Sequence, residues 1–575
     1  MVPSCAYQQT SFRDGPTVNH VPGPVLASPL RCWIAIAVVI LTTGVQGQQQ
    51  RPDADMVGWV PREILQRPVT LRAGIGNVHE RVTTESAEGQ RFYDQGLAYL
   101  HSYVWIEAAR SFNHALRFDP RLAMAHLGLS YAYSGLEDDD AANVALAQAQ
   151  SLAGGASDRE KARLEIRARQ LAAIADPSNL VRRDEYREAV NAALRTWPDD
   201  AELWILAGHA AEASPWGRGQ RGTAVTIAFY EAALARAPDH FAAHHYLTHT
   251  YETIGRPEQA LAHGKAHAQL APAVAHAQHM YGHDLRRTGR IEDAIGHFEH
   301  TRKLEEDYFE SEGVRPEYDW HYAHNLSLLA TAYQYQGRLT AAEALHRRVF
   351  ELPQFTPRFE LFHREWVEFL IGRGRVDEAL AAARDMVGSR WPAVRGAGHI
   401  LAGHALLAMG RVQDAQSECR DAERERAEIV ARGPLPVTSA MLQPYIDALG
   451  AEILLRSGNH EAAAQLFDRM QQQLRAEVGA DAWIGALFRL ESIARVAREA
   501  GHWALAERAA RWMLEHDQSY AGSHYALAVV LVQRGDRSRA RSEFADAVTL
   551  WKLADAELPE LRNARKQLAS LGLSP

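Results

Sequence analysis

The stretch GHWALAERAARWMLEHDQSYAGSHYALAVVLVQRGDRSRA, residues 501–540, contains the same pair of small residues twice. Gly501 is followed five residues later by Ala506, and Gly535 and Ala540 repeat that pair 34 residues further on. Glycine in a turn tolerates the positive φ that other residues avoid, and alanine lets two helices pack closely. The pattern therefore predicts a unit of two antiparallel helices, with the glycine in the turn between them.

The same glycine–alanine pair recurs toward the N-terminus at spacings of 34 to 48 residues. Its earlier occurrences are Gly458/Ala463, Gly410/Ala415, Gly374/Ala379, Gly337/Ala342, Gly289/Ala294 and Gly255/Ala260. A recurring period of this length is typical of repeat proteins, whose units stack on their neighbours. Residues 137–196 fit the unit poorly, although the segment LEIRARQLAAI within them still has a helical pattern.

Residues 90–120 read QRFYDQGLAYLHSYVWIEAARSFNHALRFDP and carry the other characteristic places of the unit. These places are Phe92, Gly96, Tyr99, Ala108, Phe112, Ala115 and Pro120. Over about residues 88–570, in about nine or more units, the sequence resembles the tetratricopeptide repeat. The resemblance implies an all-α fold, a tetratricopeptide-type helix-pair solenoid wound as a right-handed superhelix, with a concave face that binds a partner.

Composition restricts the classes of function. The chain has 575 residues and a formal net charge of −9, with 47% hydrophobic and 23% charged residues. This mild acidity argues against a nucleic-acid partner, because phosphate binding requires a clustered basic surface. The three cysteines exclude a disulfide scaffold.

The N-terminus has the pattern of an export signal. Residues 33–41, WIAIAVVIL, form an apolar run preceded by Arg31. The run is shorter than the roughly 20 apolar residues of a membrane-spanning helix, but it suits a signal peptide. We therefore expect residues 1–47 to be a signal peptide or, alternatively, an N-terminal membrane anchor. Residues 48–87 are expected to form an irregular leader, and the protein to be exported to the periplasm or secreted.

Histidine is unusually frequent, with 27 residues in the chain and ten of them between His244 and His300. In tetratricopeptide repeats the first helix of each unit lines the concave face, so the resemblance assigns a set of side chains to that face. The expected groove residues are His209, His245, His249, Glu252, His276, His279, His283, Arg286, His324, Asn325 and His404.

Two histidine pairs have a spacing suited to a metal ion. His245 and His249 are four residues apart, so both rings project from one helix face, and His279 and His283 repeat this spacing 34 residues later. Neighbouring helices pack about 8–10 Å apart, so we expect the four rings to be able to converge on one zinc or copper ion. Glu252 or His276 is then an additional ligand or a supporting residue.

Two alternatives to a metal site remain open. The same rings can contact a peptide in a polar groove, or they can form a structural hydrogen-bond network. A groove this rich in histidine would also gain positive charge below about pH 6 and release a cationic partner.

A narrower resemblance covers the histidine-rich segment. The stretches HHYLTHTYE (244–252), APAVAHAQHMYGHDLRRTGR (271–290) and HYAHNLSLL (321–329) resemble a group of bacterial, often exported tetratricopeptide proteins without an assigned activity. The matching positions are His245, His249, His276, His279, Met280, His283, His324 and Asn325. The resemblance implies a site at these positions without naming its chemistry.

Familiar catalytic motifs are absent from the sequence. It contains no HExxH pattern, no Gly-rich phosphate loop and no GxSxG elbow, so we assign no catalytic residue and favour a protein that is not an enzyme. The sequence thus favours an exported scaffold that binds a protein or peptide in a histidine-lined concave groove. The alternative is a metal-binding protein, or a metal-dependent enzyme, that uses the groove histidines.

Overall fold

The computed structural model describes residues 55–217, 222–431, 436–476 and 482–572. The expected signal peptide or anchor, residues 1–47, and the first part of the expected leader lie outside these ranges. The described residues from 55 onward belong to one compact unit that begins at Pro52. No helix within the described ranges is long and apolar enough to cross a membrane.

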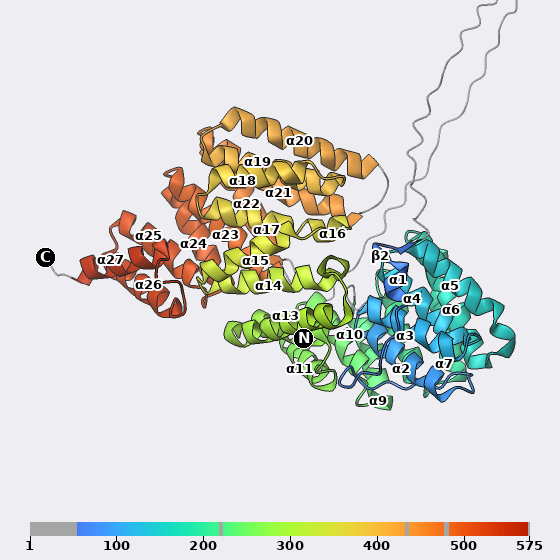
Figure 1. Cartoon of the computed structure of the whole chain (residues 1–575). Coiled ribbons are helices and arrows are strands. Elements are labelled where there is room, and N and C mark those ends of the chain that lie inside the picture. Colours follow the sequence, from blue (N-terminus) through green and yellow to red (C-terminus); the bar gives the residue numbers. More distant parts are fainter. Residues whose placement is uncertain (1–54, 218–221, 432–435, 477–481, 573–575) are drawn as a thin grey trace, which may run out of the picture. The chain divides into compact units, whose positions relative to one another are not determined.

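Helices that follow one another in pairs make up almost all of this unit (Figure 1). The N-terminal pairs are α2 (Ala87–His101) with α3 (Trp105–Phe118), α4 (Ala123–Gly135) with α5 (Asp139–Ser151), α6 (Asp158–Ala175) with α7 (Leu180–Thr196), α8 (Ala201–Ala211) with α9 (Ala224–Arg236), α10 (Phe241–Thr253) with α11 (Pro257–Leu270), and α12 (Ala275–Arg287) with α13 (Ile291–Glu312). The C-terminal pairs are α14 (Trp320–Tyr335) with α15 (Leu339–Glu351), α17 (His363–Gly372) with α18 (Val376–Val387), α19 (Pro392–Ala408) with α20 (Val412–Ala431), α21 (Pro436–Arg456) with α22 (His460–Ala476), α23 (Ala482–Glu499) with α24 (Trp503–His516), and α25 (Ala521–Arg534) with α26 (Arg537–Leu550). The helices α16 (Pro357–Glu360) and α27 (Pro559–Gly572) lie outside these pairs. The predicted all-α helix-pair solenoid is therefore confirmed.

The turn glycines behave as the sequence pattern predicts. All eight glycines of the recurring pair, from Gly255 to Gly535, have positive φ angles between 71° and 83°. The eight alanines that follow them, from Ala260 to Ala540, are fully buried. The glycine thus reverses the chain, and the alanine brings the second helix against the first.

The poorly matching segment 137–196 is helical, and buried arginines explain its unusual sequence. On α6, Arg167 donates to the Ser130 carbonyl oxygen at 2.8 Å and lies over the Tyr131 ring at 4.1 Å. Arg163 on the same helix is also buried and pairs with Glu80.

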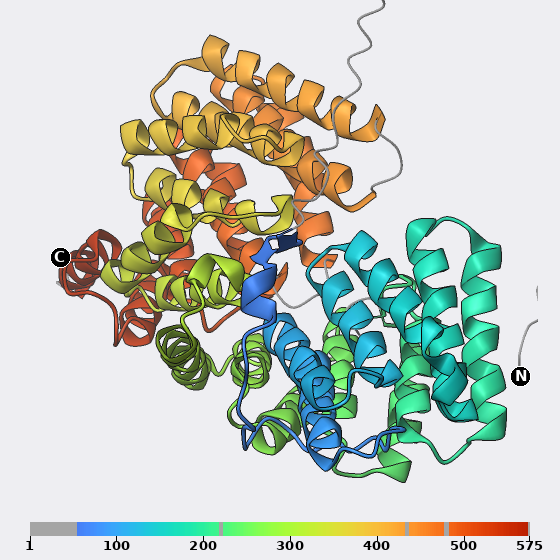
Figure 2. The same cartoon turned by 45° about the vertical axis from the view of Figure 1, so that its right-hand side comes forward.

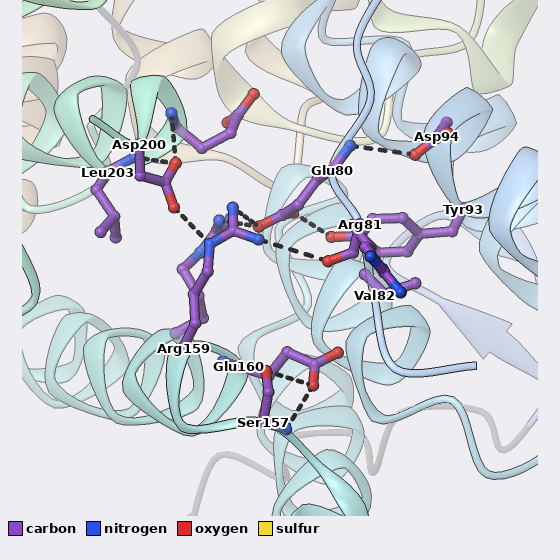
Figure 3. Close-up of polar contacts among 12 residues, drawn as sticks. Glu80, Arg81, Val82, Tyr93, Asp94, Ser157, Arg159, Glu160, Asp200 and Leu203 are labelled. Atoms are coloured by element: carbon purple, nitrogen blue, oxygen red, sulfur yellow. Dashed lines mark hydrogen bonds and ion pairs between the residues drawn. The ribbon is translucent and has the colours of Figure 1, made fainter. Parts of the chain in front are cut away.

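From residue 55 the expected leader segment is packed against the helices. It contains two short antiparallel strands, β1 (Met56–Val57) and β2 (Val60–Pro61), and the short helix α1 (Arg62–Leu65). Figure 3 shows how a later part of it is held: Arg159 on α6 donates to Glu80 at 3.1 Å and to Asp200 at 2.5 Å. Tyr93 on α2 donates to the other Glu80 oxygen at 2.5 Å.

Segments far apart in the sequence contact one another, although a repeat array requires contacts only between neighbouring units. Near the N-terminus, Tyr308 on α13 donates to Glu107 on α3 at 2.9 Å, and Trp59 donates to the Tyr318 carbonyl oxygen at 2.9 Å. In Figure 2 the dark blue segment with β1, β2 and α1 runs beside the yellow-green helices. In the C-terminal half, Tyr335 on α14 donates to Asp517 at 2.7 Å. Segments distant in the sequence are therefore packed against one another in both halves of the array.

Candidate functional site

The expected groove histidines lie mostly inside the protein. His245 and His249 belong to α10, and His276, His279 and His283 belong to α12; all five are buried. The turn between α2 and α3 covers part of this region, where the Tyr103 ring centroid lies 4.5 Å from that of His245 and 5.3 Å from that of His276. Tyr103 has a φ of 59°, a left-handed conformation that is uncommon for a bulky residue. The α2–α3 turn thus covers part of the face that the sequence predicts to be an open groove.

The four rings predicted to share one metal ion are divided between two groups. The first trio is His245, His249 and His276, and the second trio is His279, His283 and His324. Within each trio, one ligand nitrogen of every ring lies within 4.8 Å of those of the other two. His276 lies one helical turn before His279 on α12. It groups with the two histidines of α10, whereas His279 and His283 group with His324 on α14.

Hydrogen bonds fix the orientation of three rings in this region. His245 Nδ1 lies 2.6 Å from the His101 carbonyl oxygen, which can only accept, so Nδ1 carries the proton. His279 Nδ1 lies 3.0 Å from Asn325 Oδ1, and the Asn325 amide nitrogen donates to the Phe298 carbonyl oxygen at 3.1 Å. His321, on α14, places Nδ1 at 2.5 Å from Glu305 Oε1. In the first two rings the Nε2 atom keeps its lone pair.

The nitrogens at the centre of this region lack ordinary partners. Among the described residues, no hydrogen-bond partner is found for the buried Nε2 atoms of His249, His279 and His321 or for Nδ1 of His276. His245 Nε2 accepts a hydrogen bond from His276 Nε2–H at 3.0 Å, because the proton of His245 is on Nδ1. Buried nitrogens are usually satisfied in folded proteins, so the grouping of the four unpartnered ones makes this region a candidate binding site.

Burial keeps these imidazoles neutral. It lowers the pKa of His245 to about 3 and lowers the pKa values of His249, His276 and His279 well below the ordinary value. The neutral ring is the form of histidine that binds a metal ion.

Carboxylates lie beside both trios. Glu252 on α10 places one oxygen 3.3 Å from His283 Nδ1 and the other 3.8 Å from His249 Nδ1, so it lies between the trios. Burial, together with the nearby Glu252 charge, raises the pKa of Asp284 well above its ordinary value. Glu202 on α8 accepts from His101 at 3.1 Å and from His240 at 3.0 Å. Burial alone would raise the pKa of Glu202, but these two histidines hold it well below its ordinary value.

The remaining predicted groove residues lie elsewhere. His209 is buried, with its ring centroid 4.5 Å from that of Tyr246, and it belongs to neither trio. Arg286 is buried and donates to Thr331 Oγ1 at 3.4 Å. His404 on α19 is partly exposed and lies 2.7 Å from Glu452. The sequence did not assign His101, Glu202, Glu305 or His321 to the site. Glu305 lies on the second helix α13, and the other three lie at the ends of the first helices α2, α8 and α14, away from the expected groove positions.

A second feature is a hollow in the C-terminal half, which we name the C-terminal cavity. Its volume is about 420 Å³. It is lined by the first helices α14, α17, α19, α21, α23 and α25. Its apolar lining includes Phe362, Ile400, Leu401, Ile484 and Phe488. His404 is the predicted groove histidine that lines it among the described residues.

Arginine and glutamate side chains supply much of the polar part of the cavity wall. Arg489 lies over the Tyr445 ring at 4.3 Å. Arg498 is largely buried, and within the described part of the chain its Nη1 atom has no hydrogen-bond partner. Glu491 accepts from Tyr520 at 2.9 Å, and burial raises its pKa. The cavity therefore combines an apolar surface with a buried guanidinium that lacks a full set of acceptors.

Comparison with known proteins supports the repeat prediction for one segment. Residues 492–555, from the second half of α23 to just beyond α26, match the family model described as tetratricopeptide repeat. The match confirms the predicted resemblance there, while the resemblance to the histidine-containing bacterial group stays a prediction. No curated protein matches the sequence.

Two solved structures are similar at low identity. The crystal structure of yeast Tom70 is 12% identical with a TM-score of 0.33, covering 84% of this chain and 95% of that one. A tetratricopeptide repeat protein from Parabacteroides merdae ATCC 43184 is 12% identical with a TM-score of 0.28, covering 52% of this chain and 99% of that one.

Proposed function

We propose that this protein is an interaction scaffold that holds an extended segment of a partner protein in the C-terminal cavity. The observation that carries the proposal is the cavity itself, about 420 Å³ in volume and lined by successive first helices of the array. The segment that matches the tetratricopeptide family model contributes Val496, Arg498, Tyr520 and Trp551 to its wall. Repeat arrays bind partners on surfaces of this kind.

The lining indicates the chemistry of the bound segment. Phe362, Leu401 and Phe488 offer an apolar surface that suits a hydrophobic side chain. A buried guanidinium nitrogen without an acceptor is costly, and a carboxylate of the partner would satisfy the Nη1 atom of Arg498. We therefore propose a peptide segment with at least one apolar side chain next to a carboxylate.

A displayed library of random peptides, selected against the full chain, tests this proposal. Selected sequences are remade as synthetic peptides and titrated by calorimetry against the wild type, Arg498→Met and a cavity-filling variant, Ala448→Trp. A charge-assisted hydrogen bond contributes about 1.5–3 kcal/mol, so Arg498→Met should weaken binding about 10–100-fold. Arg508→Met, on the outer helix α24 with a side chain 44% exposed, is the matched control and should bind as the wild type does.

The outcome is decisive in either direction. Peptides that bind the wild type and are excluded by Ala448→Trp support the cavity as the binding site. The proposal is abandoned if the selected peptides bind Ala448→Trp and the wild type equally well.

We further propose that the protein is exported, on the strength of the apolar run at residues 33–41 and the preceding Arg31. Fusing residues 1–60 to a reporter that is active only outside the cytoplasm tests this, with Val38→Asp and Ile40→Asp as the control that interrupts the apolar run. A signal peptide is then distinguished from the alternative membrane anchor by the mass of the mature chain. Reporter activity that persists in the variant with both aspartate substitutions would contradict the proposal.

A further inference from the structure

We propose that the interior formed by α10, α12 and α14 holds two adjacent transition-metal ions of the zinc or copper type, one in each histidine trio. The first site uses His245, His249 and His276, and the second uses His279, His283 and His324. The proposal is independent of the C-terminal cavity, because none of these six residues lines it. It replaces the single four-histidine site expected from the sequence with two separate sites.

The ring spacing suits ions of this size. Metal–nitrogen bonds of about 2.0–2.1 Å in a tetrahedral site place ligand nitrogens about 3.3 Å apart. The nitrogens of each trio lie within 4.8 Å of one another, so modest rotations of the side chains bring them to that spacing. Three imidazoles per ion are a ligand set that zinc and copper both accept.

The rings are already oriented as metal ligands usually are. A metal-binding histidine commonly donates its other ring N–H to a carbonyl, an amide or a carboxylate. His245 donates Nδ1–H to the His101 carbonyl oxygen at 2.6 Å, and His279 donates Nδ1–H to Asn325 at 3.0 Å. Asn325 is held in turn by the Phe298 carbonyl oxygen. Each trio therefore contains one ring with a lone pair on Nε2, and in the first trio His245 Nε2 lies 3.0 Å from His276 Nε2.

A purely structural network explains these residues less well. Among the described residues, the Nε2 atoms of His249, His279 and His321 are buried without hydrogen-bond partners. Each unsatisfied buried group costs about 1–3 kcal/mol. A hydrogen-bond network that leaves several of its central nitrogens unsatisfied does not offset this free-energy cost. Cations bound to those nitrogens would offset it.

A buried carboxyl group lies between the two trios. Glu252 places its oxygens 3.3 Å from His283 Nδ1 and 3.8 Å from His249 Nδ1. Buried carboxylates are stable when paired with positive charge or when they support a metal site.

His321 lies between the two trios. Its ring centroid is 4.9 Å from that of His276 and 4.5 Å from that of His279, and its Nε2 atom has no hydrogen-bond partner within the described ranges. Glu305 holds its Nδ1 side at 2.5 Å. We assign His321 as an imidazole available to complete either site, oriented by a carboxylate as in many metal centres.

Metal content of the full chain, expressed without a histidine tag, tests the proposal. The protein is stripped with a chelator, incubated with Zn²⁺ or with Cu⁺ in separate samples, separated from free ions by gel filtration and analysed for metal. We expect two ions per chain. The variant H245A/H249A/H276A and the variant H279A/H283A/H324A should each retain one ion. The variant H244A/H263A/H297A, whose histidines lie outside both trios, should retain two.

Single substitutions keep the test informative where a triple variant fails to fold. His249→Gln and His283→Gln preserve much of the side-chain shape, and each should lower the affinity of one ion at least tenfold while the far-ultraviolet circular dichroism stays unchanged. Cobalt(II) substitution adds an independent measurement, because bound cobalt shows visible bands typical of tetrahedral nitrogen coordination. The absence of stoichiometric uptake of either metal by the folded wild type overturns the proposal. A single ion that is lost in both trio variants overturns the two-site arrangement.

Discussion

Two regions of the same array use the inner faces of their first helices in opposite ways. Around α10, α12 and α14 this face is filled by imidazole rings, and the α2–α3 turn with Tyr103 packs on it. From α17 to α25 the corresponding face surrounds a cavity of about 420 Å³. The helix-pair unit is alike in both regions, including the turn glycine with positive φ and the buried alanine.

The difference shows that the repeat sets the position of the inner residues but not their environment. In the N-terminal region, the α2–α3 turn places the Tyr103 ring against the rings of His245 and His276. Burial lowers the pKa values of histidines on this face such as His249 and His279. In the C-terminal region the face surrounds the cavity, and arginine and glutamate side chains supply its polar part.

Metal removal should have the largest effect and should affect the N-terminal region alone. An ion at a concentration 1,000 times its dissociation constant stabilises the folded state by about 4 kcal/mol. We therefore expect chelator to lower the Tm of the wild type by several degrees and to leave a variant lacking both trios unchanged. Scanning calorimetry with and without chelator measures this difference. Equal Tm shifts in the wild type and that variant would remove the distinction between the two regions.

Removing the group that holds His279 should weaken one of the two metal sites. Asn325→Leu deletes the acceptor at 3.0 Å from His279 Nδ1, which leaves that ring free to rotate. Residues that orient metal ligands commonly contribute about 10–100-fold to affinity. We expect that loss for the second trio and no change for the first, measured by competition with a coloured chelator. Equal weakening at both sites would show instead a general disturbance of the packing.

Acid should destabilise the protein through its buried histidines, including one outside the trios. Burial lowers the pKa of His346, on α15, to about 3. The unfolded chain binds a proton below about pH 6.5, while the folded chain does not, so this stability is lost as the pH falls from 6.5 toward 3. At pH 5 the loss is about 2 kcal/mol for one such residue.

Urea unfolding at pH 7 and pH 5 measures this contribution. His346→Leu should lose about 2 kcal/mol less than the wild type over that interval. His524 is the contrasting control: burial alone would lower its pKa, but Glu543 at 2.7 Å raises it. Its contribution is present at low pH and lost as the pH rises, so His524→Leu should lose more than the wild type between pH 7 and pH 5. Identical pH dependence in all three proteins would contradict both assignments.

The repeat could be predicted from the sequence because its determinants are local. A glycine in a turn and an alanine five residues later act within one helix pair, and all eight predicted pairs adopt the expected geometry. The positions of His245, His249, His279 and His283 on first helices could also be predicted, because they follow from the same register.

The grouping of these rings could not be predicted, because it depends on contacts between distant segments. His101 contributes the carbonyl oxygen that orients His245, across 144 residues of sequence. His321 and Glu305 form their pair across a loop whose geometry the repeat pattern does not define. The division of the four rings into two trios also depends on how His276 packs against α10. The 34-residue spacing of the repeats does not determine this packing.

Two glycines on first helices provide the smallest and most direct test of the contrast. A Cβ atom at Gly208 on α8 would lie 2.1 Å from the buried Tyr230 ring, whereas at Gly485 on α23, beside the cavity, it would meet nothing within 4 Å. Gly208→Ala should therefore destabilise the protein by about 1–3 kcal/mol through overpacking. Gly485→Ala should stabilise it by up to about 1 kcal/mol, because alanine favours the helix over glycine. Urea unfolding of both variants compares the same substitution in a filled and in an open part of the array. If both variants are destabilised equally, the inner face around Gly485 is packed as tightly as that around Gly208, and the cavity has no room for a bound segment.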